Sequence, residues 1–331
     1  MNIHILGLVF ILTSCAGQHK KINGVSFVAS NAAIENKNVQ PVLNINGNFV
    51  ALMPFGFIRD LKTPEVQYNT SRQWFGETKK GLEHYAKEFK NSNVKIMVKP
   101  HLWVSRGLFT GLIEMDSESN WKIFEDSYEK YILEYADISQ KMNVDILCIG
   151  TELEKFVIQR PEYWNQLIVK IKDVYKGKLT YAANWDEFNR VPFWSQLDYI
   201  GIDAYFPLSD EKSPTIADLE KGWEPHKKTI QQFQKKYNKQ ILFTEYGYRS
   251  VDYTGKQPWD SNQVEGSVNL EAQKNATQVL YNQFWKEDWF AGGFLWKWFH
   301  NHEDVGGENN NRFTPQNKPV EVLIKKLYGD Q

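Results

Sequence analysis

The sequence predicts a single (β/α)8 barrel, an α/β fold in which eight parallel strands alternate with helices. From residue 24 onward, short apolar runs alternate with longer amphipathic segments, which is the pattern of repeated strand and helix units around a parallel sheet. No Gly-x-Gly-x-x-Gly motif follows the first run, so the signature of a dinucleotide-binding sheet is missing. The length of 331 residues suits one barrel, since such domains commonly use about 250 residues or more.

Eight apolar runs are the predicted strands. Most are four to eight residues long and rich in Val, Ile, Leu, Phe and Tyr, as expected for strands that are covered on both faces. In chain order they are Val25–Ala29, Phe49–Pro54, Lys95–Pro100, Val144–Gly150, Leu179–Ala183, Leu197–Ala204, Gln240–Thr244 and Gly292–Trp298.

Six segments between these runs have helical patterns. In one of them Trp164, Leu167, Ile168 and Ile171 recur at steps of three and four residues, which gives one apolar stripe that can pack on a barrel. Helices after the first and fifth strands are only weakly indicated. The six predicted helices are Ser71–Phe89, Asn120–Lys141, Pro161–Tyr175, Thr215–Tyr237, Asn269–Trp285 and Lys318–Tyr328.

The charge balance argues against polyanionic partners. The chain has 39 basic and 40 acidic side chains, for a formal net charge of -1, so no broad positive field favours nucleic acid or an anionic membrane surface. Aromatic residues make up 15% of the chain, and aromatic rings suit stacking against flat apolar ligand faces. We expect a monomer that binds no nucleic acid.

The first residues predict export. Residues 1–21 contain an apolar run that is too short to span a bilayer but fits a secretory leader. The segment Leu12–Cys15 resembles a bacterial lipobox, in which Cys15 is lipidated and becomes the mature N-terminus. The alternatives are a plain signal peptide and a short hydrophobic leader of another kind. We therefore expect a leader and short tether over residues 1–21, a catalytic barrel over residues 22–331, and a lipoprotein of the bacterial envelope.

The candidate site follows from the fold, because active sites of such barrels form at the carboxyl ends of the strands. The predicted strands end in polar and aromatic side chains that suit sugar binding. These candidates are Lys99, His101 and Trp103 on the third strand, Glu152 on the fourth, Asn184 and Trp185 on the fifth, Asp203 and Tyr205 on the sixth, Glu245 and Tyr246 on the seventh, and Trp296 and Trp298 on the eighth.

Two carboxylates indicate the chemistry. Glu152 and Glu245 each follow a nearly unbroken apolar strand, so they are expected to face one another across the barrel mouth. A pair of carboxyl groups flanking a glycosidic bond can divide the work, because one protonates the leaving oxygen while the other attacks or activates water. Structural roles are the competing interpretation: a glutamate at a strand end is often ion-paired, Asp203 could pair with a lysine, His101 could be a core imidazole, and the tryptophans could plug the rim.

A metal centre is a separate hypothesis. His300, His302 and Asp304 have the composition of a ligand set, but they lie in an Asn- and Gly-rich segment beyond the last strand, so no metal is expected. No cofactor is implied either. Cys148, inside an apolar run, is predicted to be a small buried hydrophobic residue, and with Cys15 lipidated it would have no disulfide partner.

Four motifs, KPHLWV, IGTELE, DYIGIDAYFPL and FTEYGYRS, resemble glycoside hydrolase family 113 in order and spacing. The resemblance covers roughly residues 22–328 and implies a retaining endo-β-1,4-mannanase that acts on mannan or manno-oligosaccharides. It assigns Glu152 as the acid/base and Glu245 as the nucleophile. Three alternative functions remain open. They are a retaining hydrolase of another β-linked glycan, a carbohydrate-binding lipoprotein without catalysis, and a metal-dependent hydrolase using His300 and His302.

The resemblance also implies roles for other side chains. It places Tyr205 against the nucleophile and Trp296 or Trp298 beneath the cleavage subsite. Lys99, His101, Asn184, Trp185 and Asp203 match the positions of sugar-contacting residues. The chain departs from the wider clan at Thr151, where many members have Asn, and the nearest candidate for the clan's arginine on the second strand is Arg59.

Overall fold

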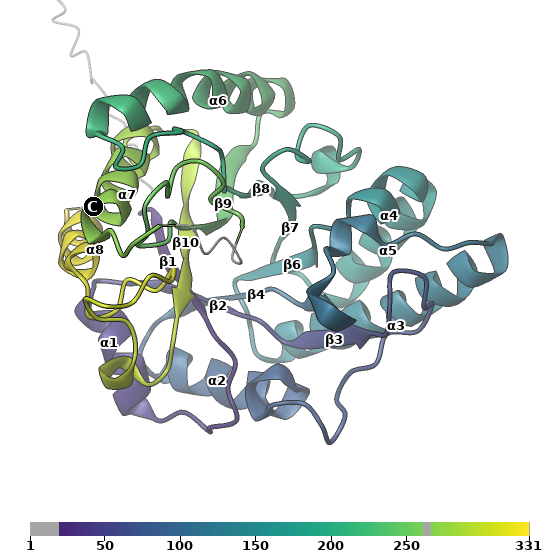
Figure 1. Ribbon diagram of the computed structural model, residues 1–331. Coiled ribbons are helices and arrows are strands. Elements are labelled where there is room, and N and C mark those ends of the chain that lie inside the picture. The colour runs from purple at the N-terminus through teal and green to yellow at the C-terminus, as the bar shows by residue number, and fades with distance from the viewer. Residues whose placement is uncertain (1–19, 261–265, 331) are drawn as a thin grey trace, which may run out of the picture.

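The structure is a computed structural model that describes residues 20–260 and 266–330 (Figure 1). The predicted leader, including Cys15, lies outside the described residues except for Lys20 and Lys21. Within the described residues, no helix combines the length and the apolar character needed to cross a membrane.

Eight parallel strands close into a barrel, which confirms the predicted fold class. Each predicted run corresponds to one barrel strand, and the order around the barrel is β1-β10-β9-β8-β7-β6-β4-β2. The strands are β1 (Ile22–Phe27), β2 (Phe49–Leu52), β4 (Lys95–Val98), β6 (Ile146–Thr151), β7 (Lys178–Asn184), β8 (Tyr199–Asp203), β9 (Gln240–Tyr246) and β10 (Phe290–Trp298).

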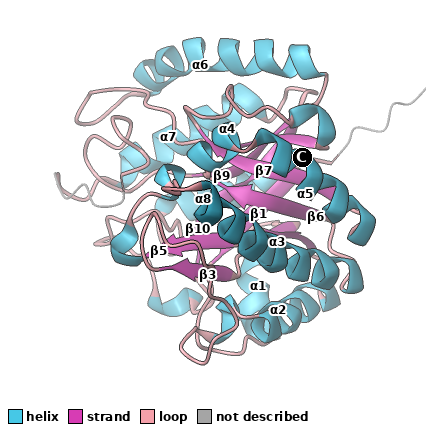
Figure 2. Cartoon of the chain, turned by 90° about the vertical axis from the view of Figure 1, so that its right-hand side faces the viewer, coloured by secondary structure: helices cyan, strands magenta, loops and turns pink. Residues whose placement is uncertain are grey.

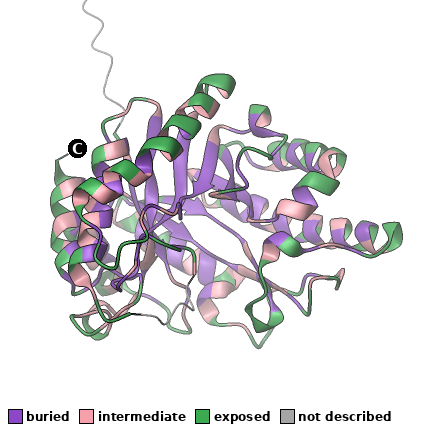
Figure 3. Cartoon of the chain, turned by 45° about the horizontal axis from the view of Figure 1, so that its top comes forward, coloured by how far each residue is buried: buried purple, intermediate pink, exposed green. Residues whose placement is uncertain are grey.

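Alternate residues of the strands belong to two core layers. A small cluster that includes Phe49, Ala51, Met97 and Cys148 fills the barrel, whereas neighbours such as Val50 join a much larger cluster beneath the helices. This division follows from the alternation of side chains along a strand. The strands are accordingly buried and the outer faces of the helices exposed (Figure 3).

Helices surround the barrel (Figures 1 and 2). All six predicted helices are present, although α2 begins later than predicted because Thr78 caps it, its hydroxyl accepting a hydrogen bond from Gly81 N at 3.2 Å. After β7 the described chain forms only a 3-10 turn, Trp194–Gln196. The helices are α1 (Asn36–Asn44), α2 (Lys79–Asn91), α3 (Glu118–Lys141), α4 (Glu154–Gln159), α5 (Pro161–Val174), α6 (Ile216–Tyr237), α7 (Leu270–Phe284) and α8 (Pro319–Gly329).

A second, two-stranded parallel sheet extends the barrel mouth and was not predicted. It pairs β3 (Phe55–Ile58) with β5 (His101–Val104), which lie side by side in Figure 2. Burial alternates along both strands, so one face packs on the protein and the other is open. Gly56 is required on the packed face, because a Cβ there would lie 2.7 Å from Val66. The open face contributes to the cavity described next.

Candidate active site

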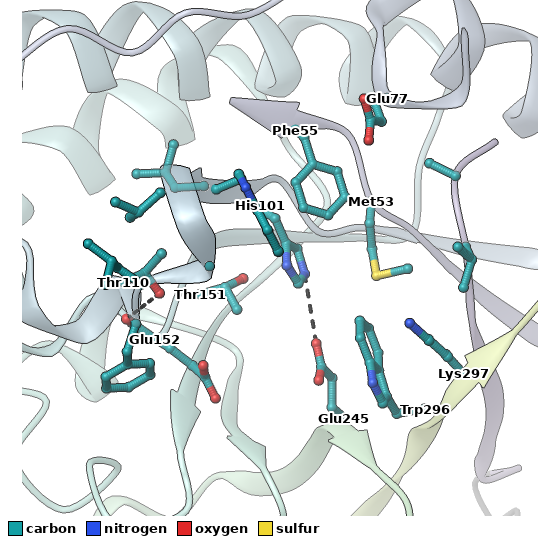
Figure 4. Close-up of a pocket in the computed structure, with 18 of the residues that line it drawn as sticks. Met53, Phe55, Glu77, His101, Thr110, Thr151, Glu152, Glu245, Trp296 and Lys297 are labelled. Carbon is teal, nitrogen blue, oxygen red and sulfur yellow. Dashed lines mark hydrogen bonds and ion pairs between the residues drawn. The ribbon is translucent and has the colours of Figure 1, made fainter. Parts of the chain in front are cut away.

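A cavity of about 730 Å³ lies at the carboxyl ends of the barrel strands. Figure 4 shows part of its lining, with Glu152 and Glu245 both extending into it. The sequence-predicted residues that line this cavity are His101, Trp103, Glu152, Asn184, Tyr205, Glu245 and Trp296. The structure therefore brings together seven of the twelve candidates, from six different strand ends.

Both oxygens of the Glu245 carboxylate have a strong donor. Lys99 Nζ lies 2.5 Å from Oε1, and the Tyr205 hydroxyl donates to Oε2 at 2.7 Å. Glu245 is 6% exposed, so few of its interactions are with solvent. Donors of this kind fix the orientation of a carboxylate.

Lys99 and Asp203 lie beneath the cavity rather than in its lining. Both are fully buried, and Lys99 Nζ lies 3.1 Å from each oxygen of Asp203, whose Oδ1 also accepts a 2.7 Å hydrogen bond from the Thr244 hydroxyl. Burial alone would lower the pKa of Lys99, but the Asp203 and Glu245 carboxylates raise it above its ordinary value. The pKa of Asp203 is itself raised by burial and by Glu245. Neither side chain lines the cavity, and Lys99 instead joins Asp203 to Glu245.

Glu152 is presented to the cavity by a sharp turn directly after β6. Its φ angle is 49°, in a region that non-glycine residues seldom occupy. Its backbone is held by its N–H, which donates to Ala182 O at 2.8 Å, and by its carbonyl, which accepts from the Thr110 hydroxyl at 3.1 Å. Burial, followed by the negative charges of Asp203 and Glu245, raises the pKa of Glu152 well above its ordinary value. That environment favours a protonated carboxyl group.

A buried network holds the next residue of the turn. The Tyr181 hydroxyl accepts a 2.7 Å hydrogen bond from Leu153 N and donates one of 2.7 Å to Glu187 Oε1. Glu187 Oε2 accepts from Asn184 N at 3.0 Å, and burial raises the pKa of Glu187 to about 8. One network thus connects the turn at Glu152 to the end of β7.

His101 lies between the nucleophile candidate and an aromatic wall. Its ring is nearly parallel to that of Trp296, with centroids 6.4 Å apart, and its Nε2 is 3.8 Å from Glu245 Oε1. Burial and the Lys99 ammonium lower the pKa of His101 well below its ordinary value. The imidazole is therefore neutral near pH 7, and its contact with Glu245 is not an ion pair.

Three of the predicted tryptophans lie in different positions relative to the cavity. Trp103 is 49% exposed on the open face of the small sheet, and Trp296 lines the cavity wall (Figure 4). Trp185 does not line the cavity, but stacks at 5.1 Å on Trp259, which does.

Tyr246 and Trp298 do not fit the predicted substrate contact. Both are fully buried, and neither lines the cavity. The Tyr246 hydroxyl instead shares 2.8 Å hydrogen bonds with those of Tyr281 and Tyr328. These two side chains pack between the barrel and its outer helices.

The metal and arginine alternatives have no matching geometry. Among residues 20–260 and 266–330, no group of three His, Cys, Asp or Glu side chains could hold a metal ion, and His302 Nε2 lies 2.6 Å from Glu321. Arg59 is exposed and does not line the cavity. The cation next to Glu245 is Lys99, from the third barrel strand.

Several lining residues were not singled out by the sequence. Alternating aromatic positions in FGFI and HLWV could have indicated Phe55 and Phe57, because residues two apart share a face of a strand. Lys297 lies on β10 beside the predicted Trp296, and Glu77 ends a 3-10 turn. The rest lie in loops, whose path the sequence does not determine. The lining residues missed include Met53, Phe55, Phe57, Trp74, Glu77, Phe109, Trp259, Lys297 and Phe313.

The chain is similar to known proteins of one glycoside hydrolase family. The model of glycoside hydrolase family 113 matches residues 27–318. The structure resembles a family 113 β-1,4-mannanase, with a TM-score of 0.80, 22% identity, and coverage of 94% of this chain and 100% of that one. It also resembles the family 113 β-mannanase AaManA from Alicyclobacillus acidocaldarius, solved with ManMIm, with a TM-score of 0.81, 20% identity, and coverage of 94% and 97%.

A more distant likeness is to a β-glucuronidase from Faecalibacterium prausnitzii, with a TM-score of 0.63, 14% identity, and coverage of 94% of this chain and 49% of that one. At such identities a structural likeness establishes a shared fold alone. No curated protein matches the chain. The family match is different in kind, because it spans most of the sequence: the chain belongs to glycoside hydrolase family 113 and is a glycoside hydrolase.

Proposed function

We propose that this chain hydrolyses β-1,4-mannosidic bonds in mannan or manno-oligosaccharides with retention of configuration. The observation that carries the proposal is that Glu152 and Glu245 extend from two barrel strands into one cavity of a family 113 chain. A β-1,4-mannanase and the β-mannanase AaManA, both of that family, share its fold, which supports mannan as the substrate.

The two glutamates have environments suited to different roles. Glu245 accepts from Lys99 and Tyr205, so it is the carboxylate that attacks the anomeric carbon and forms a glycosyl-enzyme. The raised pKa of Glu152 suits the group that protonates the departing oxygen. Glu152 then removes a proton from the water that releases the product.

The cavity wall supports binding of a chain of sugars. Trp296 and His101 form one aromatic wall beside Glu245, where the sugar that is attacked would bind. Trp74, Trp103 and Trp259 are 51%, 49% and 41% exposed at the rim. Exposed rings of this kind can stack on further sugar units, and we propose that the enzyme cleaves within chains.

Replacing the nucleophile tests the mechanism directly. Glu245→Ala should abolish hydrolysis of β-mannan, and azide should restore turnover of an activated aryl mannoside by replacing the lost carboxylate. Glu154→Ala is the matched control, because Glu154 lies two residues beyond Glu152, pairs with Arg190 and does not line the cavity. Full activity of Glu245→Ala would end the proposal.

Product analysis tests substrate and stereochemistry together. Proton magnetic resonance during digestion of mannan, glucan and xylan would report which polymer is cut and which anomer appears first. The expected result is internal cleavage of mannan with a β-anomer as the first product. Cleavage of another polymer would support the rival substrate, and an initial α-anomer would exclude retention.

We propose that the chain is exported and anchored to the bacterial envelope by lipid on Cys15. The support is the leader and the lipobox-like segment Leu12–Cys15. Expression in a bacterial host with labelled palmitate should label the wild type and Cys148→Ala but not Cys15→Ala. Labelling of Cys15→Ala, or an unlabelled wild type, would reject the anchor.

A further inference from the structure

A second cavity, of about 440 Å³, adjoins the active-site cavity. Lys297 and Phe313 line both cavities, so the two spaces meet at the end of β10. Arg249, Arg312 and Lys297 are the cationic residues in the lining of the second cavity, and Asp304 is its one carboxylate. This adjoining cavity therefore has an excess of positive charge beside the proposed cleavage point.

Lys297 has no polar partner in the part of the chain that the structure describes. Its ammonium lies 5.4 Å from the ring centre of Trp296 and 5.5 Å from that of Phe299, and no hydrogen bond or ion pair accompanies these contacts. Burial lowers the pKa of Lys297, Glu245 raises it and Arg312 lowers it further. The side chain is only partly exposed, so solvent compensates for the missing acceptor incompletely.

Arg249 is held by a contact of its guanidinium group. It is 5% exposed and its Nε donates to Asn311 O at 3.2 Å. Arg312 is exposed, and it is its backbone that is held, because its carbonyl accepts from Lys318 Nζ at 2.7 Å and from the Ser250 hydroxyl at 3.3 Å. A fixed guanidinium group such as that of Arg249 loses less freedom when it binds a ligand than a mobile one does.

Like charges are close enough to affect one another. Burial and Arg312 lower the pKa of Arg249, and Asp260 raises it in part. Burial and Arg249 lower the pKa of Lys318 to about 7. An anion in the adjoining cavity would reduce the repulsion that Asp260 leaves, whereas a neutral hydroxyl would not. Planar guanidinium groups also match the paired oxygens of carboxylate and sulfate.

We propose that Lys297, Arg249 and Arg312 bind an anionic group carried by the glycan, on a sugar next to the cleavage point. The group is either the carboxylate of an acidic sugar or a sulfate ester. This inference rests on the proposed function, because the active-site cavity must hold the glycan for its substituent to reach the adjoining cavity.

Matched oligosaccharides test the inference without turnover. The inactive variant Glu245→Gln is titrated calorimetrically with three probes: β-1,4-mannotetraose, β-1,4-linked tetramannuronate, which replaces the C6 alcohol with a carboxylate, and 6-O-sulfated mannotetraose. At least one anionic probe should bind about tenfold more tightly than the neutral one. Preference for tetramannuronate alone identifies a carboxylate, and preference for the sulfated probe alone identifies a sulfate ester.

Variants in the Glu245→Gln background assign the preference to these residues. Lys297→Met and Arg312→Gln should each reduce the ratio of anionic to neutral affinity, and added salt should reduce it as well. Lys256→Met should keep the ratio, since Lys256 is exposed and lines neither cavity. Circular dichroism and thermal melting of each variant verify that it is folded.

Two results would overturn the inference: equal affinity for all three probes, or a preference that persists in both Lys297→Met and Arg312→Gln. Hydrolysis of neutral β-mannan by the wild-type enzyme is measured separately. A wild type that binds the anionic probe but cleaves no β-mannan would reject the proposed function and leave the anion site intact. Cleavage of β-mannan with no anion preference would support the proposed function and reject the anion site.

Discussion

The Tyr205 hydroxyl donates a 2.7 Å hydrogen bond to Oε2 of Glu245. Tyr205 follows β8 by two residues, while Glu245 is the penultimate residue of the neighbouring β9. Lys99 holds the other oxygen of the same carboxylate. Two adjacent strands and a lysine from a third therefore fix the direction in which Glu245 faces the cavity.

Removing the Tyr205 hydroxyl should slow catalysis more than it weakens the fold. A hydrogen bond to a charged group contributes about 1.5 to 3 kcal/mol, so Tyr205→Phe should lower kcat/KM for mannan by about 10- to 100-fold. The ring contact with Phe313, at 6.0 Å, can remain. Steady-state kinetics check the prediction.

Tyr246→Phe is the matched control for this change. It removes a hydroxyl that is buried among Tyr281 and Tyr328, away from the cavity, so it should lower the melting temperature and affect kcat/KM less. Equal kinetic losses in the two variants would show that the Tyr205 hydroxyl has no special relation to the nucleophile.

Lys99 should be essential to stability as well as to activity. Lys99→Met would leave Asp203 and Glu245 as buried carboxylates without their cation, which should reduce the free energy of unfolding by about 3 to 5 kcal/mol. Adding Asp203→Asn should recover part of that loss, because one of the uncompensated charges is removed and the Thr244 hydroxyl can still donate to the amide oxygen. Urea denaturation measures both variants.

The control for Lys99 is Lys95→Met at the opposite end of β4, where the side chain is exposed. It should change stability little. A loss in the double variant equal to or larger than that in Lys99→Met would mean that uncompensated charge is not the cause.

The raised pKa of Glu152 predicts the alkaline limb of the pH profile. A general acid must be protonated, so kcat/KM should fall as pH rises through the pKa of Glu152. Burial is the first cause of that raised pKa and the Asp203 charge is the second. Asp203→Asn should therefore move the limb to lower pH, because less negative charge opposes ionisation of Glu152.

A substrate with an activated leaving group separates the ionisation of Glu152 from that of other groups. An aryl mannoside whose leaving group needs no proton should show a weaker alkaline limb than mannan does. The interpretation fails if the limb is the same for both substrates, or if Asp203→Asn leaves its position unchanged.

The barrel could be predicted from the sequence because each of its strands leaves a local pattern in the chain. Strands buried on both faces appear as continuous apolar runs, and parallel strands place their carboxyl ends on one rim. The positions of Glu152 and Glu245 in the sequence thus predict a common site without knowledge of their contacts. Lys99 was located on the same rim, but its long side chain reaches beneath the cavity to Asp203, which residue order does not reveal.

Trp296 and Trp298 illustrate why side-chain direction was harder to predict. Two residues apart on a regular strand, they would share a face. In β10, however, Leu295 pairs with Val25 of β1, and Trp298 pairs with Phe27. Between these two pairs β10 contains one residue more than β1. The extra residue in β10 reverses the alternation, so Trp296 lines the cavity and Trp298 is buried outside it. Such an irregularity depends on the neighbouring strand.

The turn at Glu152 should depend on the Tyr181 hydroxyl. Tyr181→Phe would leave Leu153 N and Glu187 Oε1 without their buried partner. Because an unsatisfied buried polar group costs about 1 to 3 kcal/mol, the free energy of unfolding should fall by at least that amount. The turn that presents Glu152 should also become less well held, which should lower kcat for mannan.

Comparing two substrates can distinguish a displaced acid from a generally damaged site. In Tyr181→Phe, hydrolysis of mannan, which needs the proton of Glu152, should fall more than hydrolysis of an aryl mannoside with an activated leaving group. Tyr175→Phe is the control, because its buried hydroxyl donates to Val144 O at 2.8 Å, next to the amino end of β6 and not at the carboxyl end where the site lies. Equal losses on both substrates in Tyr181→Phe would mean that the network supports the fold and not the position of Glu152.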